Sequence, residues 1–264
     1  MADEELAGGN MSAGVVRVGD TVRRPIHPWT PTIHRVLAHA HQSQLPWLPR
    51  VHGFDDEGRE ILEFIDGDVG HGDPGWIRTS DVLNDVGRAL REWHDATASY
   101  AIWDDDEWYF PPREPIETIC HGDFAPYNHV FRSGQFVGAF DFDLCTPGPR
   151  LWDIAYTAYR YVPLTPPVGS EVDDGLGADR SPYSIAAGRE RLDAFLAAYG
   201  PLERDGIERR FSADEVLAAV PARLDAVADW CAEQDSTDMQ SNGVMYRAHA
   251  RWIEAGAFSP LTGH

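Results

Sequence analysis

The feature that most constrains the fold is a set of polar residues on either side of a predicted β-hairpin. His121-Gly122-Asp123 and Asn128 precede the hairpin, and Asp141-Phe142-Asp143 follows it. An apolar run at 136–140 follows a turn signal at 132–134, which indicates two antiparallel strands. Antiparallel pairing is expected to set Asn128 opposite Asp141, with their backbones roughly 5 Å apart. The hairpin would then bring two oxygen-bearing side chains together at its open end.

The spacing of these residues points to phosphoryl transfer. Protein kinases carry a catalytic loop H-R-D-x-x-x-x-N, in which the Asp accepts the substrate hydroxyl proton and the Asn holds magnesium, and a later D-F-G Asp also binds metal. His121, Asp123 and Asn128 have that spacing, and Asp141 supplies the later carboxylate. Each residue alone would be an ordinary turn or cap residue. Together they favour a magnesium site, because magnesium takes oxygen ligands and keeps water and phosphate in its shell.

The segment from about His121 to Tyr156 resembles the aminoglycoside phosphotransferase family, a group of small-molecule kinases with a protein-kinase-like fold. The family's pattern is H-G-D-x-x-x-x-N, then a hydrophobic strand ending in I-D-[FW], then an Asp some ten residues further on. This chain has Ala139-Phe140-Asp141-Phe142 and then Asp153. The roles that the resemblance implies are a catalytic base (Asp123), magnesium ligands (Asn128 and Asp141), and structural residues (His121 and Asp153).

The resemblance also implies an α+β, bilobal protein-kinase-like fold, with a small antiparallel-sheet N-lobe and a larger, mainly helical C-lobe. Hairpin signals at 15–24 and 51–65 flank a predicted helix at 31–42, which agrees with the plan of such an N-lobe. We expect residues 1–66 to form the nucleotide-binding N-lobe. Residues 67–264 are expected to form the C-lobe, with the catalytic loop, metal site and substrate-binding helices. Further helices are predicted at 80–100 and 189–199, from Ser212, and at 238–255.

The nucleotide side of the predicted site departs from the kinase pattern. The lysine of kinase strand three corresponds here to Arg24, which can grip phosphate bidentately but with a different reach and geometry. The acidic partner expected in the next helix is absent, since residues 31–42 contain no Glu or Asp. His34 or His41 could replace it, or Arg24 could act alone. By resemblance, the backbone that would bind adenine is a hinge formed by Glu63, Phe64 and Ile65.

The charge of the chain limits the class of partner. Asp and Glu number 43 against 22 Lys and Arg, a formal net charge of -21. Nucleic acids require a basic surface, so we expect no nucleic-acid partner. An acidic protein suits a cationic small-molecule acceptor, although acidic surfaces also serve solubility alone. The candidates for pairing with an ammonium group of the substrate are Asp143, Glu233, Asp235 and Asp238.

Composition and the start of the chain predict a cytoplasmic enzyme. No apolar run approaches the length of a membrane span, and three of the first five residues are acidic, whereas the start of a signal peptide would be basic. The three cysteines, of 264 residues, have no metal-like spacing. We therefore expect reduced thiols, no membrane partner, and a monomer or homodimer.

The predicted activity is magnesium-dependent transfer of the γ-phosphoryl group of ATP or GTP to a hydroxyl of a small molecule, for example a cationic, aminoglycoside-like compound. The arginine at position 24 and the missing helix carboxylate leave open a kinase-like nucleotide-binding or immunity protein with little or no transfer. A metal-dependent phosphoesterase is a third reading, but it leaves Asn128 unexplained. No pattern identifies the acceptor, so antibiotic-resistance and metabolic roles both stay open.

Overall fold

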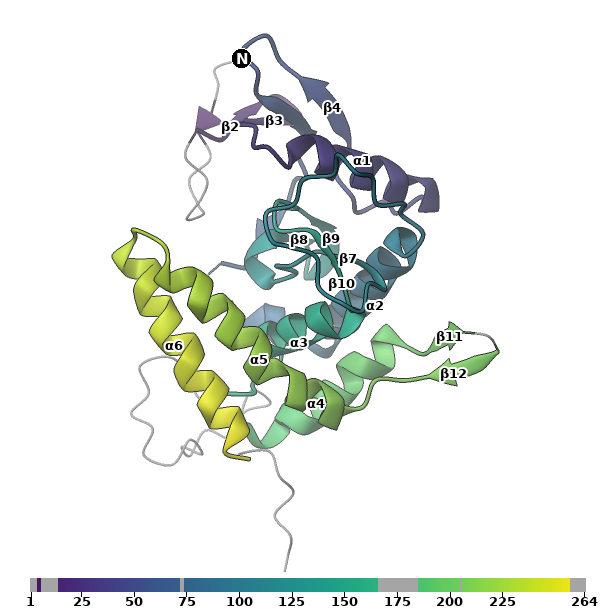
Figure 1. Ribbon diagram of the computed structural model, residues 1–264, viewed down its shortest axis with the longest axis vertical. Helices are drawn as coiled ribbons and strands as arrows, with labels where there is room; N and C mark the ends of the chain where they lie inside the picture. The colour runs from purple at the N-terminus through teal and green to yellow at the C-terminus, as the bar shows by residue number, and fades with distance from the viewer. Residues whose placement is uncertain (1–3, 6–13, 72–73, 166–184, 205, 257–264) are drawn as a thin grey trace, which may run out of the picture. The chain divides into compact units, whose positions relative to one another are not determined.

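The computed structural model describes residues 4–5, 14–71, 74–165, 185–204 and 206–256. The chain forms two compact units (Figure 1). The first comprises the described residues up to Pro74 together with Arg91–Arg150, and the second comprises Gly75–Leu90 and the described residues from Leu151. Helix α2 (Ser80–Thr97) contributes residues to both units. The division into lobes after residue 66 remains a prediction.

The first unit contains a five-stranded antiparallel sheet. Its order is β1 (Glu4–Glu5), β2 (Val16–Val18), β3 (Thr21–Arg24), β5 (Glu60–Glu63) and β4 (Val51–Phe54). The two predicted hairpins are therefore confirmed as β2–β3 and β4–β5. The sheet places β3 beside β5, and in this register Arg24 is the direct partner of Glu60.

Helix α1 (Thr30–Ala40) follows β3 and packs against β4. It confirms the predicted helix, although it begins one residue earlier and passes into a 3-10 turn, η1 (His41–Ser43). Its apolar residues recur at helical spacing and are almost completely buried, which explains why this segment is helical and which face it buries. These residues are Ile33, Val36, Leu37 and Ala40.

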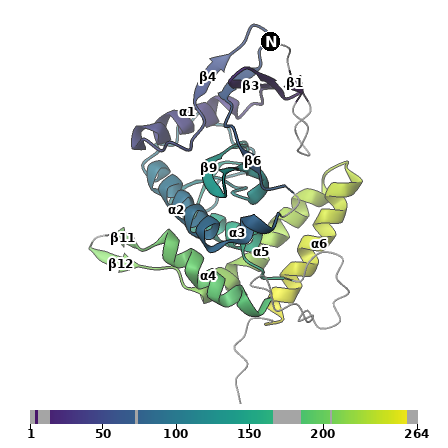
Figure 2. The same cartoon turned by 180° about the vertical axis from the view of Figure 1, so that it is seen from behind.

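A second, three-stranded sheet contains the hairpin predicted between Asn128 and Asp141. It consists of β6 (Asp68–Val69), β8 (His129–Arg132) and β9 (Gln135–Ala139), and Figure 2 shows it from behind. Between β8 and β9, Ser133 and Gly134 have φ angles of 53° and 75°. Two consecutive positive φ angles are typical of the tight turns that join two-residue hairpins, so the predicted turn is confirmed.

The register of this hairpin differs from the expected one. Phe131 pairs with Phe136, but Val130 pairs with Gly138, so β9 contains one extra residue, Val137. The backbone N–H of Phe140 donates to the carbonyl of Asn128 at 2.9 Å. Asn128 therefore lies across from Phe140, and the expected pairing with Asp141 was wrong. The two-residue turn at Ser133-Gly134 would set Asn128 opposite Ala139, and the β-bulge at Val137 moves it by only one residue, to Phe140.

Two short strands frame the catalytic loop and were not predicted. β7 (Thr118–Cys120) pairs antiparallel with β10 (Thr146–Gly148), which joins the residues before the loop to those after the hairpin. The loop between them contains the 3-10 turn η3 (Pro126–Asn128). Another 3-10 turn, η2 (Gly75–Arg78), precedes α2 in the second unit.

The second unit is mainly helical. It contains most of α3 (Arg150–Tyr161), then α4 (Ile185–Tyr199), a hairpin of β11 (Leu202–Arg204) and β12 (Ile207–Arg209), α5 (Ala213–Ala232) and α6 (Thr237–Glu254). The predicted capping box is confirmed, since Ser212 and Glu215 bond reciprocally at the start of α5. α5 and α6 lie side by side (Figures 1 and 2). Among the described residues, no helix has the length and apolar character of a membrane span.

Candidate active site

The catalytic loop begins with a backbone turn that needs glycine. Gly122 has a φ of +81°, in the left-handed region that other residues seldom adopt. A Cβ on Gly122 would lie 2.3 Å from the carbonyl oxygen of Leu144, so no larger residue fits without displacing backbone. The preceding residue, His121, is completely buried and packs against the rings of Trp93, Phe124 and Phe142. The glycine and the histidine thus fix where Asp123 leaves the core.

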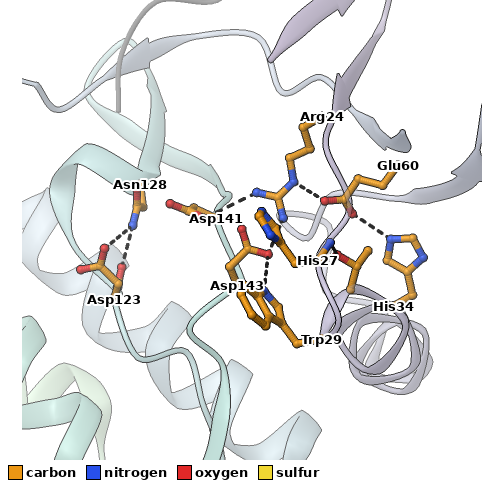
Figure 3. A network of polar contacts seen from close by, with 10 residues as sticks. Arg24, His27, Trp29, His34, Glu60, Asp123, Asn128, Asp141 and Asp143 are labelled. Atoms are coloured by element: carbon orange, nitrogen blue, oxygen red, sulfur yellow. Dashed lines mark hydrogen bonds and ion pairs between the residues drawn. The ribbon is translucent and has the colours of Figure 1, made fainter. Parts of the chain in front are cut away.

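Asp123 and Asn128 are joined by their side chains across this loop (Figure 3). Asn128 Nδ2 donates to the Asp123 carboxylate oxygen Oδ2 at 2.9 Å and to its backbone carbonyl at 3.0 Å. The other carboxylate oxygen, Oδ1, accepts from the hydroxyl of Tyr127 at 2.6 Å. Because both bonds of Asn128 use its amide nitrogen, its amide oxygen is not used in the contact with Asp123 and could serve as a metal ligand.

Asp141 follows β9 in an unusual backbone conformation, with a φ of +64°. Residues in this region are uncommon and cluster at functional sites. Its carboxylate lies 3.5 Å from Arg24 Nη1, and 42% of its side chain is exposed. Desolvation by the surrounding protein, together with the like charges of Asp143 and Asp123, raises the pKa of Asp141 to about 7 despite Arg24. A divalent cation would relieve this repulsion.

The donor atoms around Asn128 and Asp141 fit magnesium. Magnesium binds through one or two protein oxygens and completes its octahedron with water and phosphate oxygens. Asn128 offers an amide oxygen, and Asp141 offers a carboxylate that Figure 3 shows between Asn128 and Arg24. Within the described residues there is no group of three or more His, Cys, Asp or Glu that could hold a metal on its own. The ion would therefore depend on nucleotide phosphates for most of its ligands.

Arg24 is surrounded by three carboxylates (Figure 3). Its Nε donates to Glu60 Oε1, its Nη2 donates to Asp143 Oδ1 at 2.8 Å, and its Nη1 lies near Asp141. Burial opposes the charged form, but the charges of Asp143, Glu60 and Asp141 outweigh it and raise the pKa of Arg24. The guanidinium is therefore charged and held at the position where the resemblance places the phosphate-gripping group.

Glu60 supplies the carboxylate that α1 lacks. It is 1% exposed, and besides Arg24 it contacts His34 Nε2 at 2.8 Å through Oε2. His34 thus reaches Arg24 through Glu60, whereas His41 contacts the carbonyl of Pro49 at 3.1 Å. Burial raises the pKa of Glu60, but the hydrogen bond from His34 and the charge of Arg24 lower it more. Glu60 was not among the predicted site residues, although pairing of β3 with the predicted strand at 59–65 would set it opposite Arg24.

Asp143 also belongs to this network. It is 7% exposed, and its Oδ1 accepts from Trp29 Nε1 at 3.3 Å as well as from Arg24. The Trp29 ring is stacked on His27 and meets Tyr109 edge-on, with ring centroids 4.8 Å and 4.9 Å apart. The carboxylate thus already has a cationic partner inside the protein. A role for Asp143 in binding a substrate ammonium group remains a prediction.

The predicted hinge lies at the end of β5. The backbone N–H of Glu63 donates to the carbonyl of Arg50 at 2.8 Å, and that of Phe64 donates to Asp20 at 2.9 Å. Ile65 packs where Gly138 leaves room, since a Cβ on that glycine would lie 2.6 Å from Ile65 Cδ1. An adenine-binding role for this segment remains a prediction. Because the N–H groups of Glu63 and Phe64 already donate within the protein, adenine would have to bind to the carbonyls of the segment or to the N–H of Ile65.

The remaining predicted residues lie in the second unit. Asp153 is in the first turn of α3 and is 1% exposed, as a structural carboxylate would be. The three acidic candidates for substrate binding are exposed and lie where α5 ends and α6 begins. These are Glu233, Asp235 and Asp238. An acid in the first turn of a helix, such as Asp238, is also favoured by the helix dipole, so their role in substrate binding remains a prediction.

Known proteins resemble this chain in sequence and in fold. The model of the phosphotransferase enzyme family matches residues 99–195. The trifolitoxin immunity protein of Rhizobium leguminosarum bv. trifolii is 36% identical over 153 residues, which are 56% of this chain and 58% of that protein. A protein of Deinococcus radiodurans is 35% identical over 111 residues, 25% of its length. The chain thus spans less than two thirds of the length of these sequence relatives.

Solved structures share the fold over nearly the whole chain. The ethanolamine kinase of Plasmodium vivax has a TM-score of 0.62 at 11% identity, covering 96% of this chain and 83% of that one. The GDP complex of aminoglycoside 2'-phosphotransferase-IIIa has a TM-score of 0.57 at 12% identity, covering 96% and 93%. The expected α+β, protein-kinase-like fold is therefore confirmed. The chain is similar to the phosphotransferase enzyme family over residues 99–195 and shares its fold with small-molecule kinases.

Proposed function

We propose that this protein transfers the γ-phosphoryl group of ATP or GTP to a hydroxyl group of a small molecule. The observation that supports this best is the contact of Asp123 with Asn128 at 2.9 Å, in a loop of the protein-kinase-like fold. Asp141 and Arg24 lie 3.5 Å apart in the same compact unit. The family match at 99–195 includes all of these residues except Arg24.

In the proposed reaction, Asp123 orients the acceptor hydroxyl and accepts its proton. The hydroxyl oxygen bonds to the γ-phosphorus, the bond to the β–γ bridging oxygen breaks, and the nucleoside diphosphate leaves with that electron pair. Asn128 and Asp141 would hold magnesium, which supplies charge neutralisation on the phosphates. Arg24 would contact the phosphates from β3. Because the transition state is loose, these groups act mainly by positioning and by charge.

The proposal names the nucleotide and the acceptor by chemical class. GTP is a candidate beside ATP because a protein of the same fold was solved with GDP. A cationic acceptor is supported by the net charge of -21 and by two fold neighbours named for amine-bearing acceptors, ethanolamine and aminoglycosides. The exposed acids Glu233, Asp235 and Asp238 are candidates for pairing with its ammonium groups.

Transfer of labelled phosphate from ATP and from GTP to a panel of aminoglycosides, other antibiotics, sugars and amino alcohols tests the proposal. The matched control is Asp123→Asn, which keeps the size and the planar shape of the side chain and removes its negative charge and its ability to accept a proton. We expect this variant to bind magnesium–nucleotide nearly as the wild type does and to lose turnover. Turnover at the wild-type rate would overturn the role of Asp123 as base.

A second candidate function is nucleotide binding without transfer, as part of an immunity function. The similarity to the trifolitoxin immunity protein is the observation that favours it. A thermal-shift titration with magnesium and ATP should show binding in both cases, since ligand at 100 times its dissociation constant adds about 2.7 kcal/mol of stability. Binding without transfer to any acceptor would favour this second function.

A further inference from the structure

Tyr127 precedes Asn128 in the turn η3, and its hydroxyl is directed at the proposed base. Tyr127 Oη donates to Asp123 Oδ1 at 2.6 Å, while Asp123 Oδ2 accepts from Asn128. Each carboxylate oxygen of Asp123 thus receives a hydrogen bond from a residue four or five positions further along the same loop. Tyr127 is half-buried, and its hydrogen bond to Asp123 is only partly shielded from solvent.

An acceptor hydroxyl would have to form the same kind of hydrogen bond to Asp123 that the Tyr127 hydroxyl forms in this structure. A general base must lie about 2.6–3.2 Å from the hydroxyl whose proton it accepts, and Tyr127 Oη satisfies this distance to Asp123. A water molecule or an acceptor hydroxyl can reach Oδ1 only beside the phenol hydroxyl or in its place. The other oxygen, Oδ2, is already bonded to Asn128. The phenol hydroxyl therefore fills one of the hydrogen-bonding positions on Asp123 that an acceptor hydroxyl could use.

We propose that Tyr127 shields Asp123 from water until an acceptor hydroxyl replaces its own, and so limits wasteful hydrolysis of the nucleotide. This inference rests on the proposed phosphotransferase function. In the wasteful reaction, a water oxygen bonds to the γ-phosphorus and the bond to the β–γ bridging oxygen breaks. ADP leaves with that electron pair, the water proton passes to Asp123, and inorganic phosphate is released. Tyr127 takes no part in these bond changes and is a positioning residue.

The shielding can be measured directly as the rate of ATP hydrolysis in the absence of any acceptor. This assay does not require the acceptor to be identified. Tyr127→Phe keeps the ring and removes only the hydroxyl. The loss of one hydrogen bond to a carboxylate corresponds to a change of about ten-fold or more. We therefore expect Tyr127→Phe to release phosphate from magnesium–ATP about ten times faster than the wild type.

The chain offers a matched control in Tyr100. Its hydroxyl also donates to a carboxylate, at 3.2 Å and 3.1 Å to the two oxygens of Asp106, outside the proposed site. Tyr100→Phe should therefore hydrolyse ATP at the wild-type rate. Adding Asp123→Asn to Tyr127→Phe should remove the extra hydrolysis, because that hydrolysis depends on the base. Tyr127→Leu, a second variant without the hydroxyl, should show the same increase as Tyr127→Phe.

The outcomes separate this inference from the proposed function. If the wild type hydrolyses ATP faster than Asp123→Asn, and neither Tyr127 variant exceeds the wild type, the shielding role is overturned and the proposed function stands. If no variant exceeds Asp123→Asn and magnesium–ATP stabilises none of them, both are overturned. An increase in Tyr100→Phe equal to that in Tyr127→Phe would also overturn the shielding role, because the effect would not depend on contact with Asp123.

Discussion

Arg24 and Glu60 are register partners on adjacent antiparallel strands, and their side chains form an ion pair inside the first unit. In protein kinases the cation of strand three is instead paired with a glutamate of the following helix. Here α1 contributes only His34, which contacts the far oxygen of Glu60. The carboxylate that positions the Arg24 guanidinium therefore comes from the sheet and not from the helix, and the position of Arg24 depends on the register of β3 and β5.

Glu60→Gln should destabilise the protein by about 2 kcal/mol at neutral pH, because it leaves a buried arginine with one charged partner fewer. The pKa of Glu60 is lower in the folded protein than its ordinary value of 4.5. A lowered pKa contributes stability above the unfolded-state pKa, and this contribution is lost as the pH falls through the folded-state pKa. The difference in unfolding free energy between wild type and variant should therefore shrink below about pH 4.5. Urea denaturation at pH 7, 5 and 3.5 measures it, and a difference that grows on acidification would contradict the assignment.

Asp143→Asn separates two roles for that residue. If Asp143 mainly positions Arg24, the substitution should raise the KM for magnesium–nucleotide several-fold and leave the KM for the acceptor nearly unchanged. We expect this result because Asp143 is 7% exposed and already bonded to Arg24 and Trp29. The control is Asp193→Asn, an exposed acid of α4 in the second unit that has no proposed role in binding. A larger change in the acceptor KM than in the nucleotide KM would favour the ammonium-binding role instead.

Gly122→Ala should lower the unfolding free energy by about 2–3 kcal/mol, because it adds both backbone strain and a clash with Leu144. Gly58→Ala is the matched control, since Gly58 also has a positive φ, +75°, but has no atom within 4 Å of an added Cβ. It should cost about 1 kcal/mol. Chemical denaturation of both variants isolates the clash from the strain, and equal losses would show that Leu144 moves aside.

Ser212→Ala should destabilise α5 by about 1 kcal/mol, because it removes the side chain that caps the helix in the Ser212–Glu215 capping box. Ser241→Ala is the control, since Ser241 bonds only to the carbonyl of Thr237 one turn earlier in α6. That change should be nearly neutral. Thermal unfolding of the two variants tests this, and a larger loss in Ser241→Ala would contradict it.

Local signals in the sequence predicted the parts of the fold that depend on neighbouring residues. The hairpins of β2–β3 and β4–β5 follow from short-range alternation and turns, and α1 follows from the spacing of its buried residues. The loop from His121 to Asn128 could be recognised because its chemistry needs a fixed spacing.

Contacts between residues that are far apart in the sequence could not be predicted from these local signals. Glu60 comes 36 residues after Arg24, and only the order of the strands makes them neighbours. β7 and β10 have three residues each, too few for a periodic pattern. The bulge at Val137 changes the register without any breaking residue such as proline. Trp29 reaches Asp143 across 114 residues of sequence.

The bulge at Val137 also sets the spacing between the two proposed magnesium ligands. If the pairing of Phe131 with Phe136 continued without it, Asn128 would face Ala139, two residues before Asp141. With the extra residue, Asn128 faces Phe140, and the offset is one residue. One residue along a strand is about 3.4 Å, and two oxygens on the same magnesium ion lie at most about 4 Å apart. A single inserted residue is thus of the right size to decide whether both side chains can reach one ion.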